Sequence, residues 1–394
     1  MKLDIGNAPE LEWLKADSIN GTPEGADVIG KEFKRTWCSI ELLDDVLNDD
    51  YEAFSACQPD DTRITRESFN ELRDWVCSVL ETQEDMYAMR AYLVINDLGK
   101  VKDFVEKITS NLGVETVDHD KILYEGLKAH PEYSPTFNSL STVYQDLILE
   151  GLSTNFNMGQ YVQCECLPES LSPLYLINSE EALNFYMIHV LFDIAGAAGH
   201  VNSNGSLICN DLYWKKFSWA LDTIYGLVIK DIYTPLQAYV VYLKHTMDYY
   251  GVSNSYVVAK LCNMISVSTK EEAHEIEEAN NELDPKVKEV LNKELMATGH
   301  CSNTGILLYY APATFRNALG YYKKINPKTA IKNTVLKIAP VIASIFEQIR
   351  DTYSIESGVT TAFIAEVAKA AMNPEQMPST WKLIKVGDDI RVEC

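Results

Sequence analysis

The feature that most constrains this chain is an apolar, helix-like run that stops at a group of polar residues. The run ends at Ile95, and residues 96–100 continue as Asn-Asp-Leu-Gly-Lys. A helix over residues 84–99 would place Asn96 and Asp97 at its buried end, where Gly99 lets the backbone turn sharply. An amide and a carboxylate in that position are the clearest pointer to chemistry in the sequence.

Two further groups of acids and histidines follow along the chain. Residues 118–120 are Asp-His-Asp, and Asp118 is expected to cap a helix that begins at His119. His189 and Asp193 are four residues apart in a second apolar helix, so they share a face. Imidazoles and carboxylates that several apolar helices bring together are how an α-helical protein builds a divalent-metal site.

The second apolar helix, residues 180–199, ends in the small residues 195–199, and His200 follows. Small side chains let another helix or a ligand approach the backbone closely. His189 and Asp193 also have a purely structural interpretation, in which the histidine donates a hydrogen bond to the carboxylate inside the core.

The remaining pattern is mostly helical. We expect Thr65 to cap a helix through residue 80, a charged helix pair to hinge at Asp284-Pro285, and a β-hairpin to close the chain. The sequence predicts one large all-α domain with a small terminal hairpin. Its expected parts are a helical leader over 1–80, a metal-site core over 81–265 and a helical extension over 266–394, with helices over 307–319 and 334–353 and the hairpin over 381–392.

The charge and composition of the chain narrow the classes of molecule that it can bind. The 394 residues carry a formal net charge of −23, which repels nucleic acids and anionic membranes. A phosphorylated small-molecule substrate would therefore need local positive charge. The sequence has no signal-peptide pattern and no uniformly apolar run long enough to predict a membrane span, and its nine cysteines are scattered without a C-x-x-C pair. These features predict a cytoplasmic protein with reduced thiols.

Residues 96–100 resemble the HD-x-G-K helix end of the HD-domain superfamily, with asparagine in place of the histidine. The resemblance implies an all-α fold in which histidines and aspartates hold one or two divalent metals. Most members of that superfamily hydrolyse phosphoesters, and a minority are iron oxygenases. Asp97 matches the aspartate of the pair, His119 resembles the next histidine, and no histidine precedes Asp97.

The resemblance and the residue pattern together give a candidate site for Mn, Mg, Fe or Zn. Two cations, Arg90 and Lys100, would offset phosphoryl charge, and Arg90 lies seven residues before Asp97 on the same helix face. Asp120 and His189 would act as base or orienter. The expected metal ligands are Asp97, His119, Asp193 and His200. Amides and one acid suit a polar ligand, and the expected substrate-binding residues are Asn96, Asn157, Gln160, Gln163 and Glu165.

Three functions fit this sequence. The leading expectation is a metal-dependent hydrolase of a small phosphorylated or nucleotide-type substrate, in which a divalent ion makes hydroxide available near neutral pH. The second is a non-haem iron oxygenase on the same scaffold. The third is a catalytically degenerate protein that binds a ligand or partner, which Asn96 and the missing early histidine favour.

Overall fold

The computed structural model describes residues 5–16, 30–113, 118–252, 255–355, 358–378, 380–387 and 389–393. The expected leader therefore lies partly outside the described residues, as does Asp388 in the hairpin turn. Contacts divide the chain into two compact units, Met1–Asn155 with Pro173–Ser218 and Phe156–Ser172 with Trp219–Cys394. The expected boundaries at residues 80 and 265 lie inside these units.

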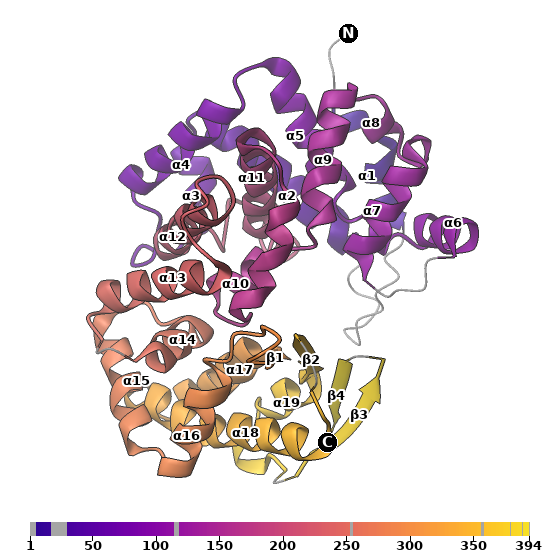
Figure 1. Cartoon of the computed structure of the whole chain (residues 1–394). Helices are drawn as coiled ribbons and strands as arrows, with labels where there is room; N and C mark the ends of the chain where they lie inside the picture. Colours follow the sequence, from indigo (N-terminus) through magenta and orange to yellow (C-terminus); the bar gives the residue numbers. More distant parts are fainter. Residues whose placement is uncertain are drawn as a thin grey trace. The chain divides into compact units, whose positions relative to one another are not determined.

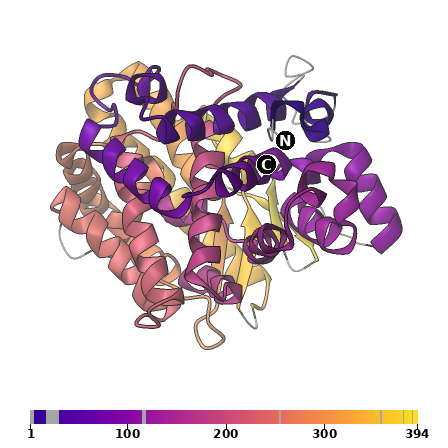
Figure 2. The same cartoon turned by 90° about the horizontal axis from the view of Figure 1, so that it is seen from above.

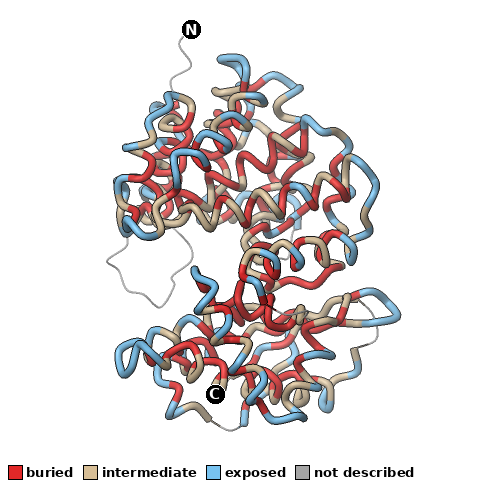
Figure 3. Tube along the Cα trace, turned by 90° about the vertical axis from the view of Figure 1, so that its left-hand side faces the viewer, coloured by how far each residue is buried: buried red, intermediate tan, exposed pale blue. Residues whose placement is uncertain are grey.

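The described part of the first unit is helical (Figure 1). Its core helix is α11, which packs along α2 and α9 and is buried around most of its circumference. Figure 3 shows how buried and exposed residues alternate along the chain. In chain order the elements are η1 Ile5–Asn7, α1 Pro9–Ala16, α2 Lys31–Leu47, α3 Tyr51–Ser55, α4 Arg66–Val79, α5 Gln83–Ile95, η3 Leu98–Lys100, α6 Lys102–Leu112, α7 His119–Ala129, η4 Pro131–Tyr133, α8 Pro135–Asn138, α9 Thr142–Ser153, α11 Glu180–Gly196 and the start of α12 Asp211–Val228.

Short polar side chains set the starts of these helices. The Thr65 side chain accepts a hydrogen bond from the backbone of Ser68, which confirms the predicted cap of α4. Thr82 and Asp85 form a capping box at the start of α5. Asp118 accepts from the backbone of two residues in the first turn of α7, as predicted. These local hydrogen bonds satisfy backbone donors that a helix start leaves open.

The second unit contains helices and a small sheet, whose strands lie side by side in Figure 1 and Figure 2. The strand order is β1-β2-β4-β3, with β1 and β4 each parallel to β2 and β3 antiparallel to β4. The elements are α10 Met158–Val162, the start of η5 Pro168–Leu176, the rest of α12, α13 Pro235–Tyr250, α14 Tyr256–Ile265, α15 Lys270–Glu282, α16 Pro285–Glu294, β1 Gly305–Tyr309, α17 Ala311–Ile325, η6 Pro327–Thr329, α18 Ala330–Thr352, β2 Val359–Phe363, α19 Ala365–Ala370, η7 Pro374–Gln376, β3 Lys382–Val386 and β4 Asp389–Glu393.

The C-terminal hairpin and the break at Asp284-Pro285 confirm the sequence prediction. The helix expected over 307–319 is wrong at its start, because residues 305–309 form the buried strand β1 and α17 begins only at Ala311. A short continuous apolar run fits a buried strand as well as a buried helix, so its periodicity does not distinguish them. The parallel partner β2 was not predicted at all.

One helical stretch meets the length and hydropathy of a membrane span, by length and composition only. It covers Pro327–Thr352, with a mean hydropathy of 1.3, and 56% of its apolar window is buried inside the structure. A core helix of a globular unit gives the same signal, and α18 packs against α15, α16 and α17. The stretch is therefore weak evidence for a membrane.

Candidate functional site

The candidate site begins where α5 ends. Asn96 forms the C-cap of α5, and the chain then closes a 3₁₀ turn in which the Lys100 amide donates to the carbonyl of Asp97, 3.0 Å away. The turn brings the Lys100 ammonium within 2.5 Å of the Asp97 carboxylate. Asp97 is buried, with 2% of its surface exposed. The polar end of the predicted helix is thus an internal ion pair.

Gly99 has a different role from the one expected. Its backbone is not among the glycines with positive φ, so the turn does not need a left-handed residue there. Instead, a Cβ atom on Gly99 would lie 1.9 Å from the backbone oxygen of His119. The absence of a side chain lets the turn 98–100 lie directly against the first residue of α7. This close approach couples the two polar segments that the sequence singled out.

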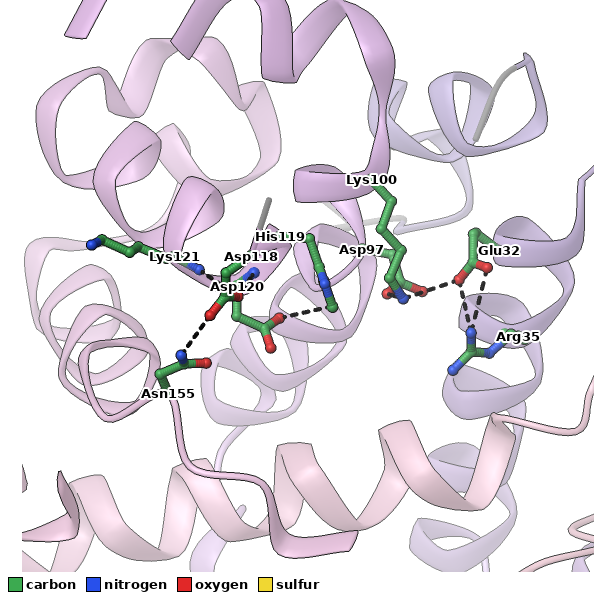
Figure 4. A network of polar contacts seen from close by, with 9 residues as sticks. All are labelled: Glu32, Arg35, Asp97, Lys100, Asp118, His119, Asp120, Lys121 and Asn155. Carbon is green, nitrogen blue, oxygen red and sulfur yellow. Dashed lines mark hydrogen bonds and ion pairs between the residues drawn. The ribbon is translucent and has the colours of Figure 1, made fainter. Parts of the chain in front are cut away.

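A buried chain of alternating charges continues from Asp97 (Figure 4). The Lys100 ammonium also lies 3.3 Å from the Glu32 carboxylate, which in turn lies 3.0 Å from the Arg35 guanidinium. Burial alone would raise the pKa of Asp97, but the cations of Lys100 and Arg35 hold it at about 2. The carboxylate is therefore ionised and neutralised by its neighbours.

Asp118, His119 and Asp120 form a second polar group beside this chain of charges (Figure 4). One potential metal-binding atom from each residue lies within 4.8 Å of the others. The His119 Nε2 is 3.2 Å from the Asp120 carboxylate, and both side chains are more than a third exposed. Asp118 also accepts a hydrogen bond from the Asn155 amide at 2.7 Å. The group is thus ordered by α7 yet open to solvent.

Asp193 links the two groups electrostatically. Burial, followed by the charges of Asp97 and Asp120, raises the pKa of Asp193 to about 6 although Arg35 and Lys100 oppose the shift. Burial and Asp97 likewise act to raise the pKa of Asp120. Three carboxylates, just after α5, in the first turn of α7 and in the last turn of α11, therefore repel one another. Asp97, Asp120 and Asp193 thus interact through space, and their predicted roles at a metal stay a prediction.

His189 lies in the core without a polar partner. Its ring stacks on Tyr92, with ring centroids 3.6 Å apart and the planes inclined by 7°. Neither its ring nitrogens nor the Tyr92 hydroxyl has a hydrogen-bond partner among the described residues. Burial lowers the pKa of His189 to about 3, with Asp97 acting in the opposite direction. The structural alternative, in which His189 donates to Asp193, is therefore wrong.

The small residues at the end of α11 have the role that the sequence predicted. A Cβ atom on Gly196 would lie 2.6 Å from the backbone nitrogen of Ser39. One on Gly199 would lie 2.5 Å from the Cβ atom of Cys38. Both contacts are with α2, which carries Glu32 and Arg35. Because these two helices pack closely, the Arg35 guanidinium of α2 interacts electrostatically with the Asp193 carboxylate of α11.

His200, a predicted metal ligand, lies near the start of α2. Burial, then the charges of Lys31 and Arg35, lowers its pKa, and its Nδ1 has no hydrogen-bond partner among the described residues. The surrounding cations give no support to a ligand role. The structure also gives no support to the predicted phosphoryl-binding role of Arg90, because its guanidinium donates to the Asp44 carboxylate at 2.8 Å.

The other expected substrate-binding residues, 157–165, belong to the second unit. Asn157 caps α10 by accepting from the Gln160 amide, and Gln163 is the C-cap of the same helix. Glu165 accepts from the backbone of Tyr310 at 2.5 Å, and burial raises its pKa to about 7. The Asn157 and Glu165 side chains thus accept hydrogen bonds from backbone at helix starts, and the substrate role of this group stays a prediction.

Sequence reasoning missed Glu32 and Arg35. Their spacing of three residues on α2 resembles an ordinary surface ion pair, and 65 positions separate Glu32 from Asp97. The small-residue stripe of α11 was the available signal that a helix would come close, but it does not identify which one.

The comparisons with known proteins give a family without an assigned activity. A family model described as "Family of unknown function (DUF6829)" matches residues 28–373. Neither a curated protein nor a solved structure matches the chain. Since the model covers most of the sequence, this chain belongs to the family of unknown function DUF6829.

Proposed function

We propose that the first unit is a divalent-cation-dependent phosphohydrolase for small phosphorylated or nucleotide-type substrates, on an HD-like helical scaffold. The observation that carries the proposal is the group of Asp118, His119 and Asp120 at the solvent-accessible start of α7, where Asp120 also interacts through space with Asp97 and Asp193. Acid-rich sites with an imidazole are the kind that Mg, Mn, Fe and Zn occupy in proteins.

The charge balance of the group fits a divalent cation. Among the described residues, five carboxylates interact there, directly or through space, with two permanently charged cations, so this group has an excess of negative charge. Burial first, and then the charges of Asp97 and Asp120, raise the pKa of Asp193, and a cation would offset the repulsion among these carboxylates. The carboxylates are those of Glu32, Asp97, Asp118, Asp120 and Asp193, and the cations are Arg35 and Lys100.

His119, Asp120 and Asp193 are the residues that would hold the ion. The chemistry that a divalent cation supplies is a lowered pKa of bound water, which provides hydroxide near neutral pH. Lys100 and Arg35 would offset the charge of a phosphoryl group, the role first assigned to Lys100 and Arg90. Asp97 would act as a positioning residue, because its carboxylate holds the Lys100 ammonium.

A second candidate, a binding protein without turnover, is favoured by one specific contact. The Lys100 ammonium already neutralises Asp97, which is the aspartate that the HD resemblance assigns to metal. Asn96 stands where the resemblance expects a histidine. Both features suit a site that recognises a polar ligand through fixed charges.

Metal content and hydrolysis, measured on the same samples, test the proposal. The probes are Mn²⁺, Mg²⁺, Fe²⁺ and Zn²⁺ with para-nitrophenyl phosphate and a nucleoside monophosphate as substrates. The test variant is His119→Ala with Asp120→Asn. The matched control is His130→Ala with Glu132→Gln, which removes another histidine–carboxylate contact, 3.0 Å long and similarly exposed.

We expect stoichiometric metal and metal-stimulated phosphate release in the wild type and in the control, and neither in the test variant. Bound iron without hydrolysis would contradict the hydrolase function and support the oxygenase function instead. No retained metal in any sample after supplementation would overturn both enzymatic functions and leave the binding protein.

A further inference from the structure

A hollow next to the 98–100 turn has no part in the proposed chemistry. It begins at Val101, the residue after Lys100, and has a cavity volume of about 290 Å³. That size is at the lower end of pockets that hold small organic ligands. Its walls come from α1, α6 and η4, which are three separate elements of the first unit.

A buried hydrogen-bond clamp fixes two of these walls. Glu10 of α1 is fully buried, and its carboxylate accepts from the Ser134 hydroxyl at 2.6 Å and the Thr136 amide at 2.8 Å. Trp13 lies three residues after Glu10 on the same helix, and Tyr133 directly precedes Ser134. The clamp therefore holds the two aromatic rings at the same cavity before any ligand arrives.

The α6 wall of the pocket is hydrogen-bonded to the η4 wall. The Asn111 amide of α6 donates to the Tyr133 hydroxyl at 2.8 Å, and the Lys107 ammonium lies 5.8 Å from the centre of the Tyr133 ring. The His130 ring stacks on Tyr133 with centroids 4.6 Å apart. Phe104 of α6 contributes a buried apolar surface. The cavity is thus a preformed aromatic pocket, which lowers the entropic cost of binding.

The charge of the lining is opposite to that of the chain. The charged lining residues are two lysines, Lys102 and Lys107, and one acid, Asp103. In the whole sequence, by contrast, acids outnumber Lys and Arg by 57 to 34. Among the ion pairs of the described residues, Lys102 has only an exposed contact of 3.9 Å with Glu106. Two ammonium groups beside three aromatic rings favour a planar ligand that carries negative charge.

We propose that this pocket, lined by Trp13, Phe104, Tyr133, Lys102 and Lys107, binds an aromatic anion. The ring of the ligand packs between the aromatic walls, and its phosphate or carboxylate faces the lysines. The site goes beyond the proposed hydrolase, since none of its lining residues belongs to the candidate metal ligands and its binding requires no metal.

Isothermal titration calorimetry on the full chain in EDTA tests the pocket. Adenosine monophosphate and indole-3-acetate are the two aromatic anions, and they distinguish a phosphate from a carboxylate as the anionic group. Adenosine offers the ring without the charge, and ribose 5-phosphate offers the charge without the ring. We expect at least one aromatic anion to bind more tightly than both of these incomplete probes.

Two variants assign the binding to this cavity. Trp13→Leu keeps an apolar side chain on α1 and should weaken binding about tenfold, as lost ring stacking does. Lys107→Gln, at an exposed position, should weaken it about threefold and reduce its salt dependence. Lys128→Gln is the matched control, because the exposed Lys128 ammonium lies 5.0 Å from the Tyr124 ring outside the cavity.

Binding that responds to Trp13→Leu and Lys107→Gln but not to Lys128→Gln would support the pocket. No binding of either aromatic anion at millimolar concentration would overturn it, and so would binding that neither pocket variant changes. Because EDTA removes divalent metal, failure here is distinguishable from failure of the proposed hydrolase.

Discussion

Replacing His189 with phenylalanine should change how the stability of this protein depends on pH. The phenyl ring preserves the stack on Tyr92, where the His189 ring lies 3.6 Å from its partner. It removes two ring nitrogens that have no hydrogen-bond partner among the described residues, and it removes the titration of the group.

The sign of the effect follows from the pKa of His189. Burial lowers this pKa to about 3 in the folded chain, against roughly 6.5 in an unfolded one. As the pH falls below about 6.5, the unfolded state gains a proton that the folded state cannot bind, so the wild type loses stability until the pH reaches about 3. At 1.36 kcal/mol per pH unit, this loss amounts to about 2 kcal/mol between pH 7 and pH 5.

Urea denaturation of the wild type and His189→Phe at the two pH values measures the effect. We expect the stability of the variant relative to the wild type to rise by about 2 kcal/mol from pH 7 to pH 5. His189→Gln is the control, because it cannot titrate but still buries polar atoms without the stacked ring. It should show the same pH response from a lower stability at pH 7.

A relative stability of His189→Phe that is equal at pH 7 and pH 5 would refute this reasoning. It would mean that His189 is equally easy to protonate in the folded and unfolded chains, and hence that the ring is not sealed from water or from a proton acceptor.

Two further predictions concern the polar turn after α5. Gly99→Ala should destabilise the first unit by about 3 kcal/mol and reduce metal binding, because its Cβ would clash with the His119 carbonyl oxygen. Gly320→Ala in α17, where a Cβ meets no atom within 4 Å, should instead stabilise the protein by about 0.5–1 kcal/mol. Equal effects of the two substitutions in thermal unfolding would contradict the close approach of Gly99 to His119. Asp97→Asn should cost about 3 kcal/mol at pH 7 by leaving Lys100 without its nearest carboxylate, whereas Asp44→Asn at the more exposed Arg90 pair should cost less than about 1 kcal/mol. Since the pKa of Asp97 is about 2, its stabilisation is present above about pH 4 and is lost as the pH falls through 2, so a deficit of Asp97→Asn that persists at pH 2 would argue against the ion pair.

Much of the candidate site was predictable because its parts are signalled locally. The acids and histidines at the ends of apolar runs indicated Asp97, His119, Asp120 and Asp193, which interact in the structure. The same reasoning did not identify the partner of Arg90, whose helix face was estimated from its spacing alone. A seven-residue spacing gives the direction of a side chain but not its partner, and Arg90 donates to Asp44 of α2.

The sequence by itself determined the helix starts, the break at Asp284-Pro285, the terminal hairpin and the small-residue face of α11. Each depends on residues within a few positions of one another, whose capping, ring or side-chain size acts on the adjacent backbone. Only the tertiary structure decided that α2 supplies Glu32 and Arg35, that residues 305–309 become a strand beside β2, and that His189 has no polar partner in the described part of the chain. These outcomes depend on which distant segments pack together, because an ion pair, a parallel strand pair or an unpaired buried nitrogen is a property of two or more segments at once.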